Sequence, residues 1–483
     1  MLFNSHAFLL VFLPVTWLLH RGLIRTQLAD GRAAHALLVM ASLAFYGWWS
    51  VRGLLLLLGL MAANYAATIW LVRRRCAPGI ARRMVLLAGL TGNLAILCYF
   101  KYANFLLENW AGLIGTQSAF VNVALPLGIS FFTFQKIALL VDAYLGKVVS
   151  LNPLDFMLFV TFFPQLIAGP IVHHAEVMPQ FARRIIPTAA DFHAGLTLLA
   201  IGLAKKILIA DTAATWASPV FARAGVIVPG AADAWGAAVA YSLQLYFDFS
   251  GYCDMALGAA LLLGIHLPVN FDSPYKAASI IDFWRRWHMT LSRFLRDYLY
   301  IPLGGNRAGA IRHQFNLFVT MLLGGIWHGA GWTFVVWGAL HGVFIVVNHG
   351  WRAFQRRRGW RADRFGLANL LARSATLLAV LAGWVFFRSA DMPTAFAMLK
   401  GMAGQGNASS DTMNLAALSM LAGMLGIVWL APNSMEIAGQ RGTNILAHWE
   451  PGWSRTRAVA SGLLLAAGVL SLSRVSEFLY FQF

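Results

Sequence analysis

Charge is scarce in this chain. Charged residues make up only 12% of its 483 residues, about half of the roughly 25% found in an ordinary soluble domain. Hydrophobic residues reach 59% and form unbroken runs such as Leu54–Met61. These runs exclude the alternation of a transmembrane β-barrel, and many approach the roughly 20 residues with which a helix spans a bilayer. The sequence therefore predicts an all-α polytopic membrane protein.

Acidic residues are scarcer still, with 19 Asp and Glu against 37 Lys and Arg and a formal net charge of +18. In a soluble protein this surplus would suggest nucleic-acid binding. Here most of the basic residues lie in short loops beside apolar runs, where the positive-inside rule places them. We therefore expect no nucleic-acid partner, although basic loops also suit anionic lipid headgroups or the phosphates of a coenzyme.

Cysteine and the common catalytic motifs are also rare or missing. Cys76, Cys98 and Cys253 are the three cysteines, and their spacing predicts neither a disulfide framework nor a zinc site. The sequence has no Gly-x-Ser-x-Gly turn, no phosphate-binding glycine loop and no His-Glu-x-x-His. No metal is expected.

The apolar runs predict about 11–13 transmembrane or re-entrant helices. They lie in one domain, residues 1–483, at approximately 7–24, 33–50, 52–72, 84–101, 119–141, 154–172, 190–210, 234–264, 314–327, 331–349, 367–388, 412–431 and 458–473. The N-terminus lacks a basic region and a small-residue cleavage site, so we expect a first span there rather than a signal peptide. With the arginine-rich loops in the cytoplasm, both termini are predicted to lie outside.

Residues 265–313 are the least membrane-like segment, in which basic and aromatic residues are mixed. Within it, Asp282–Tyr300 has neither proline nor glycine and is predicted as one amphipathic helix, ended by Pro302 and Gly304. One interpretation is an interfacial helix with aromatic anchors and snorkelling arginines. The other is a re-entrant helix that carries His288 inward.

Two histidines stand against the apolar background, His288 in Trp-Arg-Arg-Trp-His and His328 in Gly-Gly-Ile-Trp-His-Gly. Imidazole moves protons near neutral pH, and an ionisable side chain at membrane depth is a candidate for function. Glycines beside His328 favour a loosened helix end that faces a cavity, and a hydrogen-bonded packing histidine is the alternative. For His341, packing is the favoured interpretation.

A polar cluster of Tyr246, Asp248 and Asp254 lies inside another apolar run. Buried carboxylates need partners, and the basic residues of 265–313 are the expected suppliers. Structural pairing is favoured over catalysis for this cluster.

Several distinctive motifs are spread along the chain, from the end of the first hundred residues onwards. They are Tyr99–Phe105, Leu125–Phe134, Pro164–Pro170, Gln244–Asp254, Phe283–Ser292, Leu295–Asn306 and Gly324–Gly329. Together they resemble the membrane-bound O-acyltransferases, in particular the bacterial branch that contains the alginate O-acetylation and teichoic-acid D-alanyl transfer proteins. The chain after Arg352 matches more loosely, except at its end.

The resemblance implies a ring of helices around a central tunnel that opens to each face. It also implies that His328 is the catalytic histidine and His288 the second active-site residue. A hydroxyl is a weak nucleophile unless a base such as neutral imidazole takes its proton. Acetyl-CoA is the expected acyl donor. From their charge, the side chains expected to bind its phosphates are Arg285, Arg286, Arg293 and Arg296.

The C-terminal aromatic motif, residues 478–483, has two interpretations. Tyrosine and phenylalanine commonly anchor a chain at the membrane interface. In the teichoic-acid system, however, a small separate peptide ends in a similar motif whose tyrosine is proposed to carry the acyl group. The resemblance therefore suggests Tyr480 as an acyl relay, because a phenolate leaves more easily than an alkoxide.

The sequence thus predicts an enzyme of the bacterial inner membrane, with periplasmic termini, that moves acetyl groups from cytoplasmic acetyl-CoA for O-acetylation of an exported polysaccharide resembling alginate or cellulose. The expected partners are a periplasmic acetyltransferase, the polysaccharide synthesis and export machinery, and membrane lipids. The alternatives are transfer of D-alanyl or another acyl group, a transporter or flippase, and a scaffold. A transporter could use glycine-broken helices, but no internal repeat pairs the two halves.

Overall fold

The computed structural model of the protein describes residues 1–25, 31–75, 78–117, 120–121, 124–181, 186–307, 309–359, 366–406, 411–439, 455–472 and 478–479. The chain divides into two compact units. The first unit comprises residues 1–204, 252–269 and 434–481, and the second comprises residues 205–251, 270–433 and 482–483. The organisation of the chain as one functional domain stays a prediction.

Helices dominate both units, which confirms the prediction of an all-α polytopic membrane protein. Six stretches among the described residues are long and apolar enough to cross a bilayer. They are Ala7–Arg25, Val51–Arg73, Gly79–Ile114, Ala189–Ala224, Trp332–Arg357 and Leu367–Arg388.

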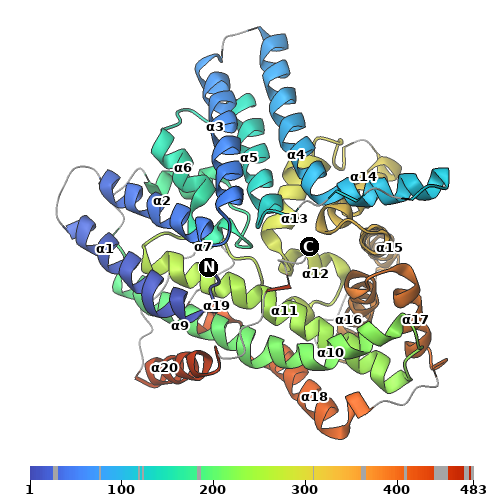
Figure 1. The fold of residues 1–483 in the computed structure, drawn as a ribbon. Helices are drawn as coiled ribbons and strands as arrows, with labels where there is room; N and C mark the ends of the chain where they lie inside the picture. The colour runs from blue at the N-terminus through green and yellow to red at the C-terminus, as the bar shows by residue number, and fades with distance from the viewer. Residues whose placement is uncertain are drawn as a thin grey trace. The chain divides into compact units, whose positions relative to one another are not determined.

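The first unit is built mainly from the N-terminal half of the chain (Figure 1). Its elements are η1 Ala7–Phe12, α1 Leu13–Arg25, α2 Arg32–Gly47, α3 Val51–Arg73, α4 Gly79–Ile114, α5 Ile129–Tyr144, α6 Pro153–Thr161, α7 Phe163–Leu166, α8 His174–Phe181, α9 Ala189–Ala204, the end of α11 Ala231–Leu262, α19 Ser434–Ile437 and α20 Arg455–Leu470. Helices α9 and α11 cross at two glycines, because a Cβ on Gly258 would come within 2.6 Å of the carbonyl oxygen of Gly195.

The second unit contains both histidine motifs. Its elements are η3 Lys205–Ala210, α10 Asp211–Ala224, the first part of α11, η4 Pro274–Lys276, α12 Ile280–Arg286, α13 Met289–Leu295, η5 Arg296–Tyr300, α14 Ala310–His328, α15 Trp332–Arg357, α16 Leu367–Arg388, α17 Met392–Met402, η6 Asp411–Met413 and α18 Leu415–Leu430. Side-chain caps start several of these helices: Ser279 accepts a hydrogen bond from the Asp282 amide at the start of α12, as an N-cap serine is expected to do.

Two predicted helices are interrupted. The candidate span 154–172 ends at Thr161, and a separate turn of helix begins at Phe163, because Pro164 fits only the first turn of a helix. The predicted amphipathic helix Asp282–Tyr300 was wrong as one element, since α12 ends at Arg286 and α13 begins at Met289. The break places His288 between two short helices.

A buried ion-pair network ties α11 to the segment before α10. The Lys206 ammonium lies 2.8 Å from Asp248 and 2.9 Å from Asp211. The side chains of Lys206 and Asp248 are each only 2% exposed. Residues 265–313 were expected to supply the partner of Asp248, and this was wrong: Lys206, which lies within the candidate span 190–210, supplies it.

Replacing Lys206 by methionine is expected to destabilise the protein by about 3–5 kcal/mol, because the Asp248 carboxylate would stay buried without its cation. The measurement is thermal unfolding of the purified protein in detergent. Lys205→Met is the matched control, since the neighbouring Lys205 is half-buried and rests over the Tyr246 ring instead. Equal melting temperatures for the two variants would contradict this prediction.

Candidate active site

His288 occupies the break between α12 and α13. The chain there adopts a left-handed conformation with φ +43°, which is uncommon for a residue with a Cβ. The side chain is fully buried, and its ring meets Phe249 edge to face at a centroid distance of 4.8 Å. Of the two sequence interpretations, burial agrees with the segment that carries His288 inward.

Asn270 holds the turn at His288 in place. The Asn270 Oδ1 accepts from the Thr290 amide at 3.2 Å and from the Thr290 hydroxyl at 2.9 Å, and its backbone carbonyl accepts from the Met289 amide at 3.0 Å. Because a backbone N–H can only donate, the Thr290 amide fixes which end of the Asn270 amide is oxygen. The sequence did not predict a role for Asn270, because it is a single polar residue between Val269 and Phe271 and belongs to none of the motifs.

The same oxygen also sets the tautomer of His288. His288 Nδ1 lies 3.1 Å from Asn270 Oδ1. Since Oδ1 accepts, Nδ1 carries the proton, and the neutral ring keeps its lone pair on Nε2. A buried imidazole whose ring is oriented by a hydrogen bond to Asn270 is suited to accept a hydrogen bond or a proton at that nitrogen.

His328 is the last residue of α14 and is also buried. Its helix stays regular up to that point, and Gly329 continues in extended backbone. The neighbouring glycines serve close packing instead: a Cβ on Gly325 would come within 2.7 Å of the Gly338 Cα, and one on Gly338 within 2.8 Å of the Met321 carbonyl oxygen. Helices α14 and α15 therefore form a tight hairpin that carries His328 at its bend (Figure 1).

Aromatic rings connect the two predicted histidines. The Trp327 ring lies 6.5 Å from the His288 ring and 4.9 Å from the His328 ring, measured between centroids. On the other side of His328, Trp337 follows at 5.1 Å and Phe387 at 5.2 Å. The structure thus brings both histidines into one buried cluster, which we call the histidine–tryptophan cage, with an indole between them.

His341 extends the cage by one more ring. It lies 4.8 Å from Trp337, and the Trp284 indole N–H donates to its Nδ1 at 3.2 Å. Because indole nitrogen only donates, the proton of His341 is on Nε2. Among the described residues, neither this Nε2 nor the Trp337 indole nitrogen has a hydrogen-bond partner. The cage therefore holds two buried donors in addition to the His288 acceptor.

The arginines predicted to bind coenzyme phosphates differ in their surroundings. Arg286 pairs with Asp282 at 3.0 Å, and Arg296 pairs with Asp297 at 2.7 Å, which raises the pKa of Arg296 above its ordinary value. Arg293 is half-buried on α13.

Arg285 is exposed and belongs to a basic cluster near the end of α15. It interacts electrostatically with Arg352, and together with Arg352 and Arg356 it surrounds His349. Arg352 also donates to the Ser279 hydroxyl at 2.9 Å. Arg285 therefore has two basic neighbours, Arg352 and Arg356, that were not among the arginines predicted to bind the coenzyme.

Tyr480 lies outside the described residues. Next to it, Phe478 is buried in the first unit, where its ring meets Tyr252 edge to face at 4.9 Å. The role of Tyr480 as relay or anchor stays a prediction. In the same unit, Asp254 accepts a hydrogen bond from the Ser434 hydroxyl at 3.1 Å.

A further cluster in the first unit joins Asp142 to His173 and His174. Their ligand atoms lie within 4.8 Å of one another, a separation that could admit a metal ion. Asp142 also pairs with Lys147 at 3.0 Å. His173 donates from Nε2 to Asp142 at 2.7 Å while its Nδ1 accepts from the Ala175 amide. His174 Nδ1 lies 3.2 Å from the same carboxylate, so Asp142 already contacts a lysine and both histidines.

Comparison with known proteins identifies the class to which this polytopic helical protein belongs. The model of the MBOAT, membrane-bound O-acyltransferase family matches residues 75–387, a range that contains the whole cage. The chain belongs to the membrane-bound O-acyltransferase family, and it is a multi-pass membrane-bound O-acyltransferase.

Individual relatives extend the comparison over the whole length. The chain is 38% identical to a peptidoglycan O-acetyltransferase of Helicobacter pylori, over 100% of this chain and 98% of the relative. It is also 38% identical to a probable alginate O-acetylase, AlgI, of Pseudomonas aeruginosa, over 100% of both chains. A teichoic acid D-alanyltransferase of Streptococcus thermophilus is 28% identical over 49% of this chain and 59% of its own length.

Replacing Asn270 by alanine is expected to lower acyl transfer by about 10-fold, because His288 would be free to change tautomer and its Nε2 would no longer be held as the acceptor that orients the hydroxyl. Asn270→Asp is the matched variant, since it keeps an acceptor oxygen for His288 and Thr290. The readout is the pH profile of acyl transfer by purified protein. A purely structural role would leave the shape of that profile unchanged in both variants.

Proposed function

We propose that this protein transfers acetyl groups from acetyl-CoA in the cytoplasm towards an exported polysaccharide. Full-length similarity to a peptidoglycan O-acetyltransferase and to a probable alginate O-acetylase supports acetyl as the acyl group and a cell-surface glycan as the destination. The single observation that carries the chemistry is the buried cage that joins His288 and His328 through Trp327. The enzyme would lie in the bacterial inner membrane with both termini in the periplasm, as the basic loops indicate.

In the proposed reaction, a hydroxyl attacks the thioester carbonyl, a C–O bond forms and the C–S bond breaks. His328 takes the hydroxyl proton and passes it to the departing thiolate, so that free coenzyme A leaves as the thiol. His288 accepts a hydrogen bond at Nε2 and orients the hydroxyl. The tautomer supported by Asn270 argues against His288 as the group that polarises the carbonyl, because its Nε2 carries no proton in the neutral ring.

The carbonyl oxygen would be polarised by a buried donor of the cage. The indole N–H of Trp337 and the Nε2–H of His341 lack partners among the described residues, and a buried polar group without a partner needs an explanation. Donors that point to where charge develops in the transition state provide a large part of enzymatic rate enhancement. Trp337 is adjacent to His328, which makes it the stronger candidate.

The exposed Arg285, with Arg352 and Arg356 beside it, is proposed to bind the phosphates of acetyl-CoA. Guanidinium groups form strong, paired hydrogen bonds to phosphate. Arg286 and Arg296 already pair with aspartates, so they contribute less to this proposal than the sequence alone suggested.

Tyr480 is proposed to receive the acetyl group and to present it to a periplasmic acetyltransferase that acts with the polysaccharide synthesis and export machinery. A second candidate is transfer of a D-alanyl group by the same residues, which is favoured by the partial similarity to a teichoic acid D-alanyltransferase.

His328→Ala is expected to reduce transfer of labelled acetyl from acetyl-CoA by at least about 100-fold, the lower range for loss of a general base, and Trp337→Phe by a smaller factor. The assay uses purified protein and measures release of coenzyme A and label on the protein. His6→Ala, an exposed histidine near the N-terminus, is the control. Full activity of His328→Ala would reject the proposal, and label from a D-alanyl donor alone would favour the second candidate.

Tyr480→Phe is expected to abolish acetylation of the polymer in cells while the amount of protein in the membrane stays unchanged. The physical reason is that the substitution keeps the aromatic ring and removes only the hydroxyl that would carry the ester. Mass spectrometry of the C-terminal peptide after incubation with acetyl-CoA should find the added acetyl on Tyr480 in the wild type. Normal polymer acetylation in the variant would reject the relay and leave the aromatic anchor.

A further inference from the structure

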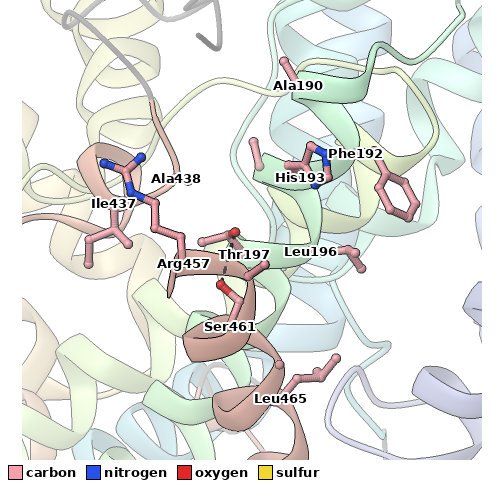
Figure 2. A pocket seen from close by; sticks show the side chains of 13 residues that line it. Ala190, Phe192, His193, Leu196, Thr197, Ile437, Ala438, Arg457, Ser461 and Leu465 are labelled. Carbon is pink, nitrogen blue, oxygen red and sulfur yellow. Dashed lines mark hydrogen bonds between the residues drawn. The ribbon is translucent and has the colours of Figure 1, made fainter. Parts of the chain in front are cut away.

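A cavity of about 290 Å³ lies in the first unit between α9 and α20 (Figure 2). Helix α9 lines it with Phe192, His193 and Leu196, and helix α20 with Arg457, Ser461 and Leu465. This cavity takes no part in the proposed acyl transfer, because the residues assigned to that reaction lie in the second unit and in the C-terminal motif.

The two helices run parallel along the cavity. The Ser461 hydroxyl donates to Thr197 at 3.3 Å, and seven residues further a Cβ on Gly468 would come within 2.7 Å of the Leu203 side chain. From the first contact to the second, the residue numbers rise on both helices, from 197 to 203 on α9 and from 461 to 468 on α20. The N-terminal ends of the two helices therefore lie at the same end of the cavity.

The cavity therefore has its charged side chain, Arg457, towards one end. Arg457, Ser461 and Leu465 occupy successive turns on one face of α20, and the first and last are about 12 Å apart along the helix. Figure 2 shows His193 and the Arg457 side chain towards one end and Leu465 towards the other.

The basic end also has the residues of a membrane interface. Phe192 packs against Trp17 at a centroid distance of 5.6 Å, and Arg21 rests over the Trp17 ring at 5.2 Å. Tryptophan and arginine gather at the level of lipid headgroups.

The outer face of α20 is apolar and exposed. Val459, Leu463 and Leu470 are 61%, 67% and 83% exposed, as expected for a helix whose outer face contacts hydrocarbon in a multi-pass membrane protein. A ligand that reaches the cavity from this side comes from the bilayer.

We propose that this cavity binds a phospholipid with an anionic headgroup, whose phosphate contacts Arg457 and whose acyl chain lies along Leu196 and Leu465. A cation at one end and apolar side chains further along the cavity, at Leu196 and Leu465, match the two parts of such a lipid. Anionic lipids are attracted to basic side chains at the cytoplasmic surface, the side on which the positive-inside rule places Arg457.

The test measures binding of phosphatidylglycerol and phosphatidylcholine with identical acyl chains to the purified full-length protein by native mass spectrometry. Arg457→Gln is expected to weaken phosphatidylglycerol binding about 10-fold, the effect of losing one charge-assisted contact, and to leave phosphatidylcholine binding unchanged. Arg455→Gln is the matched control, because Arg455 is exposed on the same turn and does not line the cavity.

A second variant fills the cavity instead of changing its charge. A Cβ on Gly462 would meet no heavy atom within 4 Å, so Gly462→Leu should fold and exclude both lipids. Gly426→Leu, also in open space but on α18, is its control.

The proposal is overturned if Arg457→Gln binds phosphatidylglycerol like the wild type, or if Arg455→Gln weakens binding equally. It is also overturned if inorganic phosphate alone competes fully with phosphatidylglycerol, because the site would then recognise free phosphate rather than a lipid.

Discussion

Burial of polar rings away from water is the constraint on which the second unit depends. An imidazole or indole that loses water must find a partner for its nitrogen or leave a costly group unsatisfied. Part of the second unit meets this demand locally: Asn270 Oδ1 serves Thr290 and His288, Trp284 donates to His341, and Trp384 donates to the Tyr275 hydroxyl at 3.1 Å. Each bond fixes a ring and, for His288 and His341, the nitrogen that carries the proton.

The same constraint explains the backbone at His288. A left-handed residue with a Cβ costs about 1–3 kcal/mol and persists only where its surroundings hold it. Here the side chain and the carbonyl of Asn270 bond to three consecutive residues of the turn, His288, Met289 and Thr290. The contacts that hold the break after α12 are therefore the same contacts that orient the imidazole. The hydrogen bonds of Asn270 offset the strain of the left-handed backbone at His288.

Hydrophobic periodicity predicted most of the helices because runs of apolar residues determine which segments leave water. It could not place the break inside 282–300, since nothing local to Trp287 and His288 forbids a helix, and the cause is the distant Asn270. Likewise, the need of Asp248 for a cation could be read from the sequence, but its partner Lys206 could not, because the pairing depends on how η3 approaches α11. The motifs singled out His288 and His328 as candidates. The tautomer of His288 and the buried donors Trp337 and His341 depend on three-dimensional contacts that the sequence does not contain.

The glycines around His328 illustrate why residue type alone does not fix a role. They were expected to loosen the helix, as glycine does where nothing replaces its missing side chain. In the structure, Gly325 and Gly338 instead remove the Cβ atoms that would separate α14 from α15. Close approach brings Trp337, one turn before His341 on α15, against His328 at the end of α14. The hairpin glycines thus act on the site through packing, because His328 and Trp337, the proposed base and the proposed donor, lie on different helices and only a tight crossing puts them in contact.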